Sequence, residues 1–456
     1  MQARKALTGP EINRDLLHPV VVTPLWFWLA AMALGLVVLV GVATFGNMLI
    51  WGLAVTGLNR PTMWGVMITN FVFWVGISHA GVMISAILRL SQAEWRFPVT
   101  RAAEILTVFA LATAALFPVI HAGRPWRVIY WVFPYDFQRG IWPDIRSALI
   151  WDPSAIFTYL TGSALFIYVM LIPDLAICRD HVGGWRRGLY RVLALGFRGT
   201  GRQWKLQLIA GILLAALILP VFVSVHSIVS WDFAVTLVPA WHATIFAPYF
   251  VIGAIWSGVA AVVTVMVIIR RVFHLEDYIT LDHFDAVGRL LIVVGNAWFF
   301  FYLLDSLFSL YGNEALDIAV WEMRFFQWPW NLLFAIFLVT VYFIPMPMLL
   351  FRRVRRSIPL LVLASISVNI GMWLERYLII VPGLARKSPL TFSGGNYSPS
   401  VSEIIYVITS FALVALGVLL FSKFFPLIPI SDQKEGQMFA TTMRIGRREI
   451  PAVIRE

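Results

Sequence analysis

The sequence predicts an all-α integral membrane protein with about ten transmembrane helices. Hydrophobic residues make up 60% of the 456 residues and charged residues only 13%, roughly half the charged share of a soluble domain. The apolar residues form runs that are long enough to cross about 30 Å of hydrocarbon, and most charges lie between these runs. The mean hydropathy of +0.81 agrees with this prediction, because a protein whose surface is largely apolar needs lipid rather than water around it.

The polar residues 1–24 are expected to be a cytoplasmic N-terminal tail. The apolar run that follows them is too long for a signal peptide and has no clear small-residue cleavage site. Residues 425–456 are expected to be a second cytoplasmic tail. The membrane domain, residues 25–424, should hold ten spans at 25–55, 64–90, 102–121, 153–177, 205–230, 244–270, 287–310, 330–351, 357–381 and 401–424.

The prolines of the spans lie mostly where a missing N–H does little harm. Pro118 and Pro173 are expected in the last turns of spans three and four, whereas Pro220 lies inside span five and predicts a kink. We expect spans two to five and six to nine to form two four-helix bundles, with spans one and ten outside them. No strong sequence repeat accompanies this division, so it depends on hydropathy alone.

The distribution of basic residues predicts the orientation. With ten spans, both tails and the even-numbered loops share one side of the membrane, and that side carries 26 of the 35 Lys and Arg residues. Basic loops stay in the cytoplasm. Both termini are therefore expected to be cytoplasmic, in a bacterial inner membrane, and the odd-numbered loops are expected outside.

Several cofactor and ligand classes are not expected. Cys178 is the only cysteine, so the chain has no disulfide framework and no all-cysteine metal cluster. A cytochrome b would need two histidines about four turns apart on one helix, and no span has them, although the histidines of spans two and five could pair across helices. The P-loop and the common hydrolase motifs are absent. We expect no haem, iron–sulfur cluster or other metal, and no nucleic acid partner despite the net charge of +11, since the basic residues lie in short loops.

Ionisable residues inside the spans indicate function, because each costs about 2.5–3.5 kcal/mol at the bilayer centre. If odd-numbered spans run outward, His79 lies near the middle of its span, Asp174 near the cytoplasmic face, and Glu375 and Arg376 in the outer third. The group expected at the outer face is His121, Asp152, His226, Asp232 and Asp305, with Arg124 and Tyr130 in the following outer loop.

Imidazoles and carboxylates at one membrane face suit the oxidation of a quinol. A quinol releases two protons as it loses two electrons, and each hydroxyl needs a proton acceptor within hydrogen-bond reach. The ring and its isoprenoid tail need an apolar slot that opens to lipid. Each residue also has a structural interpretation: Asp232 as a helix-ending residue, for example, or Glu375 and Arg376 as partners of other helices. The convergence on one face supports the hypothesis more than any single residue does.

Two other functions remain open. A secondary transporter would show Gly- or Pro-broken helices at matching positions of two halves, and apart from Pro220 the prolines lie mainly towards span ends. The second open function is that of a structural membrane anchor for peripheral subunits. Co-purifying redox subunits and extractable quinone would favour quinol oxidation, whereas cation-dependent uptake by the chain alone would favour the transporter.

Seven stretches spread over nearly the whole chain resemble the NrfD/PsrC-like family of membrane subunits. Within that family the closest resemblance is to ActC, the quinol-oxidising membrane subunit of bacterial alternative complex III. The stretches are ISHAGVMISAILRL from Ile77, HAGRPWRVIYWVFPY from His121, WDPSAIFTYL from Trp151, LIPDLA from Leu171, SVHSIVSWDFA from Ser224, PAWHATIFAPYFVIGAIWSG from Pro239 and SISVNIGMWLERYLII from Ser365.

This resemblance implies a function and a set of partners. The quinol, with menaquinol as the expected form, binds near the outer face, and electrons leave through a periplasmic iron–sulfur subunit. Multihaem c-type cytochrome subunits, a homologous ten-helix membrane subunit and membrane lipids complete the expected partners. His121, Asp152 and Asp232 match the family's proposed quinol ligands. We further assign His79, Arg124, Tyr130 and His226 as candidate quinol-binding residues, and Asp174, Asp305, Glu375 and Arg376 as candidates for a proton path.

Overall fold

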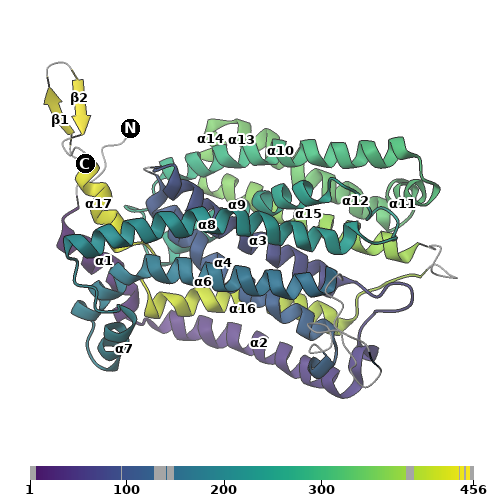
Figure 1. Ribbon diagram of the computed structural model, residues 1–456, viewed down its shortest axis with the longest axis horizontal. Coiled ribbons are helices and arrows are strands. Elements are labelled where there is room, and N and C mark those ends of the chain that lie inside the picture. The colour runs from purple at the N-terminus through teal and green to yellow at the C-terminus, as the bar shows by residue number, and fades with distance from the viewer. Residues whose placement is uncertain are drawn as a thin grey trace.

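The structure, a computed structural model, describes residues 7–93, 95–127, 140, 148–386, 395–440, 442–445 and 448–451. Among these residues, ten helices are long and apolar enough to cross a membrane, which confirms the predicted number. They lie roughly parallel and make one elongated bundle (Figure 1). The spans are α2 (Leu25–Trp51), α3 (Val66–Leu90), α4 (Arg96–His121), α6 (Ala148–His181), α8 (Gly201–Ala234), α9 (Phe246–Val272), α10 (Leu281–Gly312), α12 (Trp330–Leu338) continued by α13 (Pro345–Leu350), α15 (Ile358–Ala385) and α16 (Val401–Phe424).

Several helices are longer than hydropathy alone predicts. The helices α4, α6, α8 and α10 each begin four to six residues before the expected span. In α4 the additional turn contains Arg101, whose charge is neutralised inside the protein by Asp174. The prediction that Pro173 lies in a last turn is wrong, because α6 continues for two further turns to His181.

Short elements cover the two ends of the bundle. At the end that carries both chain termini lie α1 (Gly9–Val21), α7 (Trp185–Leu193), α14 (Arg352–Arg355), α17 (Ile430–Ala440) and the antiparallel pair β1 (Thr442–Ile445) and β2 (Arg448–Pro451) (Figure 1). At the opposite end lie η1 (Gly52–Val55), η2 (Pro125–Arg127) and α11 (Ala315–Phe326).

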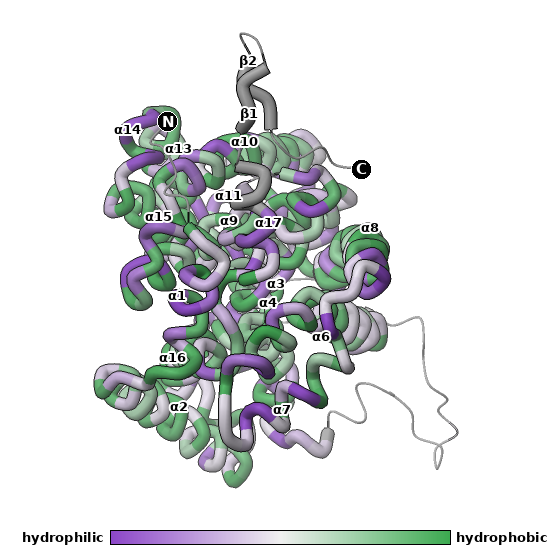
Figure 2. The backbone as a smooth tube through the Cα atoms, turned by 90° about the vertical axis from the view of Figure 1, so that its left-hand side faces the viewer, coloured by the Kyte–Doolittle hydropathy of each residue, from purple (hydrophilic) through white to green (hydrophobic). Residues whose placement is uncertain are grey.

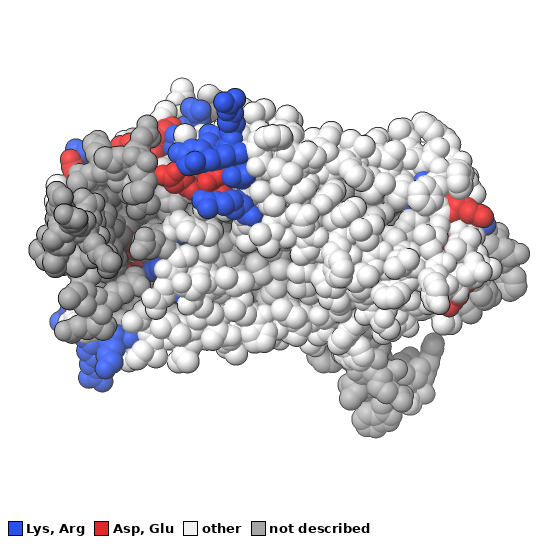
Figure 3. All heavy atoms as spheres, turned by 90° about the horizontal axis from the view of Figure 1, so that it is seen from above, with Lys and Arg blue, Asp and Glu red and all other residues white. Residues whose placement is uncertain are grey.

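Charge separates the two ends from the middle. On the face shown in Figure 3, Lys and Arg gather towards the end with the termini, and the long middle part shows almost no charged atoms. Seen from that end, hydrophilic residues mark α14 and parts of α7, whereas most of the helices are hydrophobic (Figure 2). A band of lipid around the middle fits this distribution.

The helix α3 lies at the centre of the molecule and contacts α4, α8, α9, α15 and α16. Small residues permit its closest approaches: a Cβ on Gly81 would lie 2.2 Å from Thr107 Oγ1 of α4, and one on Gly258 would lie 2.0 Å from Ala80 Cβ. The remaining contacts between helices define two groups. One contains α3, α4, α6 and α8, and the other contains α9, α10, α12 and α15. We therefore retain the division into two four-helix bundles as a proposal.

The first and last spans pack against each other at the periphery. Only 11% of the apolar window of α2 is buried, and most of its inter-helix contacts are with α16. Lys423, in the last turn of α16, donates hydrogen bonds to the carbonyl oxygens of Pro19 and Val22, both at 2.6 Å. The N-terminal helix α1 is thereby attached to the last span.

Candidate functional site

A cavity of about 380 Å³ lies at the end of the bundle opposite the chain termini. His121 reaches it from the last residue of α4, Asp152 from the second turn of α6, and Asp232 from the last turn of α8. Because α4 and α8 run towards this end and α6 runs away from it, the three helices bring these side chains together. The rest of the lining is apolar: Trp64, Ile68, Phe71, Val72, Ala115, Pro118, Val119, Pro153, Ile156, Phe157, Leu160, Val229 and Phe233.

The two carboxylates of the cavity lack part of their hydrogen bonding. Asp152 and Asp232 lie close enough for their negative charges to repel each other. The Oδ1 atom of each is buried and has no hydrogen-bond partner among the described residues. A buried acceptor of this kind is unfavourable until a donor satisfies it. The cavity therefore suits a mostly apolar ligand that carries hydroxyl groups.

Aromatic rings fix one wall of this cavity. Trp64 stacks on Trp241, with ring centroids 5.5 Å apart, and meets the Phe233 ring edge-on at the same distance. The indole N–H of Trp241 donates a 2.7 Å hydrogen bond to the carbonyl oxygen of Ile379 on α15. The wall is thus held by a helix of the proposed second bundle, and its position depends on packing between the two groups of helices.

The structure places His79 and His226 together but outside the lining of this cavity. Their buried rings contact each other, with centroids 5.0 Å apart. The His79 ring also stacks on Tyr159 at 4.1 Å and donates from Nδ1 to the carbonyl oxygen of Val75. His226 lies nearly two helical turns from Asp232 towards the middle of α8, so it is deeper than the sequence suggested.

Of the two remaining candidates for quinol binding, the structure describes Arg124 alone. Arg124 lies beside the end of α2, where its Nε would be 4.0 Å from a Cβ on Gly52, and it is not among the lining residues. Tyr130 lies outside the described residues.

Glu375 and Arg376 form a buried polar centre among α9, α10 and α15. Glu375 Oε1 accepts hydrogen bonds from the Tyr249 hydroxyl and, at 2.9 Å, from the indole N–H of Trp298. The Arg376 guanidinium lies 3.3 Å from Glu375 Oε2 and over the ring of Phe250, 4.4 Å from its centroid. The sequence did not indicate Tyr249 or Trp298, because aromatic residues in an apolar span give no sign of a polar partner.

Asp305 lies nearer the end opposite the termini, where it lines a separate cavity of about 220 Å³. Its main electrostatic partner is Arg324, whose Nη2 donates to the carbonyl oxygen of Leu378 at 2.9 Å. His242, Glu314 and Asp317 line the same cavity. The structure thus separates Asp305 from the cavity of His121.

Asp174 lies near the end with the termini and has a full set of partners. Arg101 Nη2 donates to one carboxylate oxygen at 2.9 Å, and the other accepts from the backbone N–H groups of Ile430 and Ser431 and from the Ser431 hydroxyl, each at 3.1 Å. Glu104 lies 3.3 Å from Arg101 and accepts from Ser85 at 2.6 Å. Sequence reasoning missed Arg101 and Glu104, although two opposite charges one turn apart in an apolar stretch were an available signal.

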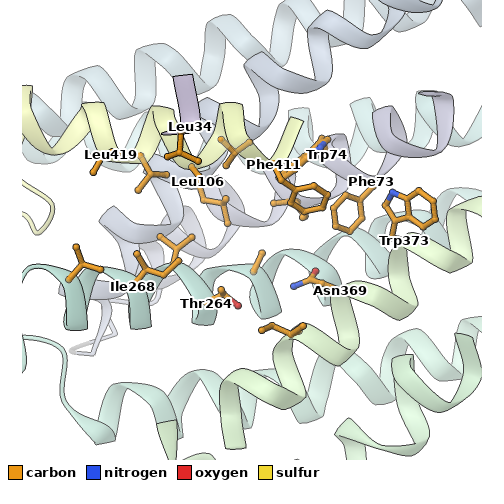
Figure 4. A pocket seen from close by; sticks show the side chains of 18 of the residues that line it. Leu34, Phe73, Trp74, Leu106, Thr264, Ile268, Asn369, Trp373, Phe411 and Leu419 are labelled. Atoms are coloured by element: carbon orange, nitrogen blue, oxygen red, sulfur yellow. The ribbon is translucent and has the colours of Figure 1, made fainter. Parts of the chain in front are cut away.

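A second cavity, larger than that of His121, has no ionisable side chain among the described residues that line it. Its volume is about 760 Å³, and it lies between the peripheral pair α2 and α16 and the helices α3, α9 and α15 (Figure 4). Thr264 and Asn369 are among the few polar residues in a lining dominated by side chains such as Phe73, Phe411 and Trp373. Proton transfer needs titratable groups, and the cavity of His121 has them in its lining.

Comparison with known proteins gives one family and two relatives. The model of the family described as "Polysulphide reductase, NrfD" matches residues 54–387. The chain is 25% identical over 432 residues to a putative membrane subunit of a dimethyl sulfoxide reductase from Halobacterium salinarum, covering 88% of this chain and 91% of that protein. It is 21% identical over 425 residues to a selenate reductase subunit from Mesobacillus selenatarsenatis, covering 88% and 94% respectively.

Proposed function

The chain belongs to the polysulphide reductase NrfD family of membrane subunits of oxidoreductase complexes, and from this premise we propose that it binds and oxidises a quinol. The observation that carries the proposal is the cavity in which His121, Asp152 and Asp232 meet. Three groups that can accept protons, supplied by three helices, face one apolar space. A quinol ring fits this combination, because its faces are apolar and its two hydroxyls donate hydrogen bonds.

The proton balance assigns a role to each residue. Oxidation of a quinol to a quinone removes two electrons and two protons. In the proposal, His121 accepts the proton of one hydroxyl and Asp152 that of the other, while Asp232 is an alternative acceptor that passes protons onward. The electrostatic interaction of the two carboxylates supports this scheme, since a proton taken up by either one removes their repulsion.

The orientation of the chain determines where the protons go. Basic residues predict that the end with the termini is cytoplasmic, which puts the cavity beside the outer leaflet of a bacterial inner membrane. Protons released there would leave on the outside, and a periplasmic iron–sulfur subunit would receive the electrons. Asp305, Glu375 and Arg376 remain proposed members of a proton path, and none of them lines the cavity of His121. We propose that this path runs through the other group of helices.

Two kinds of complex fit a quinol-oxidising subunit. In the first, an alternative complex III, this chain is the ActC-type subunit, with menaquinol as donor and with multihaem c-type cytochromes and a second ten-helix subunit as partners. In the second it delivers electrons to a terminal reductase. The names of the two relatives, both subunits of reductases, favour the second. The quinol site is the same in both, and only the partners differ.

Purification of the native complex tests this proposal. We expect extractable quinone, an iron–sulfur protein among the co-purifying subunits, and reduction of that subunit when a quinol is added. Multihaem c-type cytochromes in the complex would indicate the first kind and a large reductase subunit the second. A chain that purifies alone, contains no quinone and catalyses cation-dependent uptake in vesicles would contradict the proposal and identify a transporter.

A further inference from the structure

Three metal-ligating side chains meet beside the cavity of Asp305. They are His242 in the segment between α8 and α9, Glu314 at the residue before α11, and Asp317 in the first turn of α11. His242 Nε2 lies 3.2 Å from Glu314 Oε2 and 3.8 Å from Asp317 Oδ2, and one ligand atom of each residue lies within 4.8 Å of the other two.

Other hydrogen bonds orient two of these side chains. His242 Nδ1 lies 3.2 Å from the carbonyl oxygen of Val238, which can only accept, so Nδ1 carries the proton and Nε2 of the neutral ring has a lone pair. Asp317 Oδ1 accepts a 2.7 Å hydrogen bond from the backbone N–H of Ala240, which leaves Oδ2 directed towards His242. Supporting contacts of this type are what fix the ligands of metal sites in proteins.

The arrangement suits a bound cation. The lone pair of neutral His242 faces two carboxylate oxygens, which is unfavourable unless a proton or a metal ion lies between them. The 220 Å³ cavity beside the three ligands is also lined by Asp305, so three carboxylates there face the guanidinium of Arg324. A divalent cation would balance this excess of negative charge.

We propose that His242, Glu314 and Asp317 form a binding site for a divalent transition metal of the Zn²⁺ class. Zn²⁺ binds imidazole nitrogen and carboxylate oxygen at about 2.0–2.2 Å, so the edges of its tetrahedron measure about 3.3–3.6 Å. The separations of 3.2 and 3.8 Å lie close to such edges. The Glu314 side chain is 64% exposed, so it can rotate until the three ligand atoms form one triangular face of the tetrahedron. The cavity leaves room for water as a fourth ligand.

This site lies apart from the proposed quinol cavity. It lies beside α10 and α11, whereas the proposed quinol cavity lies among α3, α4, α6 and α8. Metal binding can therefore be measured without any electron-transfer assay. If the experiment contradicts one of the two proposals, the other is unaffected.

The test is a titration of the purified full-length protein with Zn²⁺, after a chelator has removed bound metal, in competition with a chelating dye. We expect one tight site per chain, and Co²⁺ in its place should give the intense visible absorption of tetrahedral coordination. His242→Ala, Asp317→Asn and Glu314→Gln should each weaken binding at least about 100-fold, more than the loss of a supporting contact costs. Asp317→Asn keeps an oxygen for the Ala240 N–H.

The matched control is His274→Gln, which removes an exposed histidine at the opposite end of the molecule. It should bind Zn²⁺ as the wild type does. Glu314 is exposed, so Glu314→Gln tests the site even if the variants at His242 or Asp317 fail to fold. The proposal is overturned if wild type binds no stoichiometric metal, if Glu314→Gln binds equally well, or if His274→Gln loses as much affinity as His242→Ala.

Discussion

Two buried groups of charged residues, one near each end of the bundle, differ in how completely their polar atoms are satisfied. Asp174 near the termini receives four hydrogen bonds, one of them from Arg101 as an ion pair. Asp152 and Asp232 at the other end each keep a buried oxygen without a hydrogen-bond partner in the described part of the chain, and both face a cavity.

The difference separates a structural role from a chemical one. A carboxylate whose acceptor sites are already filled stabilises the fold and has little left for a ligand. A carboxylate that faces an apolar space with an acceptor site open is unfavourable alone and favourable with a hydroxyl beside it. We therefore propose that Asp174, a candidate for the proton path on sequence grounds, mainly fastens α17 to α4 and α6.

The largest expected effect is on quinol oxidation when the cavity loses a proton acceptor. His121→Ala and Asp152→Ala should each lower quinol turnover by about 10²–10⁴-fold, the usual contribution of a general base. Assembly of the complex should be unchanged, because neither substitution touches the buried ion pair of Arg101 with Asp174. Turnover of the purified variants, with co-purification of partners as the check on assembly, measures this.

Asp152→Asn is the sharper companion variant, because it keeps the shape and removes the basicity. It should be as inactive as Asp152→Ala, whereas Asp180→Asn, an exposed carboxylate at the other end of α6, should behave as the wild type. Normal turnover in both His121→Ala and Asp152→Ala would remove these residues from the mechanism.

For the buried charged group near the termini we expect the opposite result, a loss of stability with quinol oxidation retained. Asp174→Ala leaves Arg101 buried without its closest partner, and breaking a buried ion pair in this way costs about 3–5 kcal/mol of stability. Thermal unfolding in detergent should show the loss, and any folded protein should still oxidise quinol. An inactive but fully stable Asp174→Ala protein would return this residue to the proton path.

A moderate effect is expected at the aromatic wall between the two groups of helices. Trp64→Leu removes the stacking on Trp241 and the edge contact with Phe233, and such pairs contribute about 0.5–1.5 kcal/mol each. The KM for quinol should rise about three- to tenfold while kcat changes little, since no proton acceptor is lost. A fall in kcat at unchanged KM would place Trp64 in the chemical step instead.

The smallest effect concerns pH and His242. Burial lowers the pKa of His242, but the Val238 carbonyl oxygen and the carboxylates of Asp317 and Glu314 raise it by more, so the pKa lies above the usual 6.5. Protonated His242 therefore stabilises the fold below pH 6.5, and this contribution disappears as the pH rises through the folded-state pKa. With a chelator present, the difference in melting temperature between wild type and His242→Gln should shrink on going from acid to alkaline pH. A difference that is independent of pH would show that the ring is neutral throughout.

Hydropathy and the direction of each span were sufficient to predict much of this molecule. They placed α16 at its observed bounds, and they brought His121, Asp152 and Asp232 to one end, because consecutive helices in a membrane must alternate in direction. Depth along a helix was less certain, as His226 shows, since its contact with His79 depends on the rotation of two helices about their axes.

Interactions between distant residues were beyond prediction. The true start of α4 depends on Asp174, more than seventy residues later, to neutralise Arg101. The partners of Glu375 come from α9 and α10. The group of His242, Glu314 and Asp317 comes from two segments separated by a whole span. The pattern of residues within one segment carries no information on such pairs, because the pairs form only when separate helices pack against each other.

The pairing of α2 with α16 has a consequence for biosynthesis. The span α2 has its main helical partner in α16, which is made about 350 residues later. At typical synthesis rates of about 5–20 residues per second, α2 spends on the order of tens of seconds in the bilayer before that partner is made. The surface of α2 is compatible with this delay, because it is apolar on almost every side. Lys423 reaches α1 only after α16 has been made.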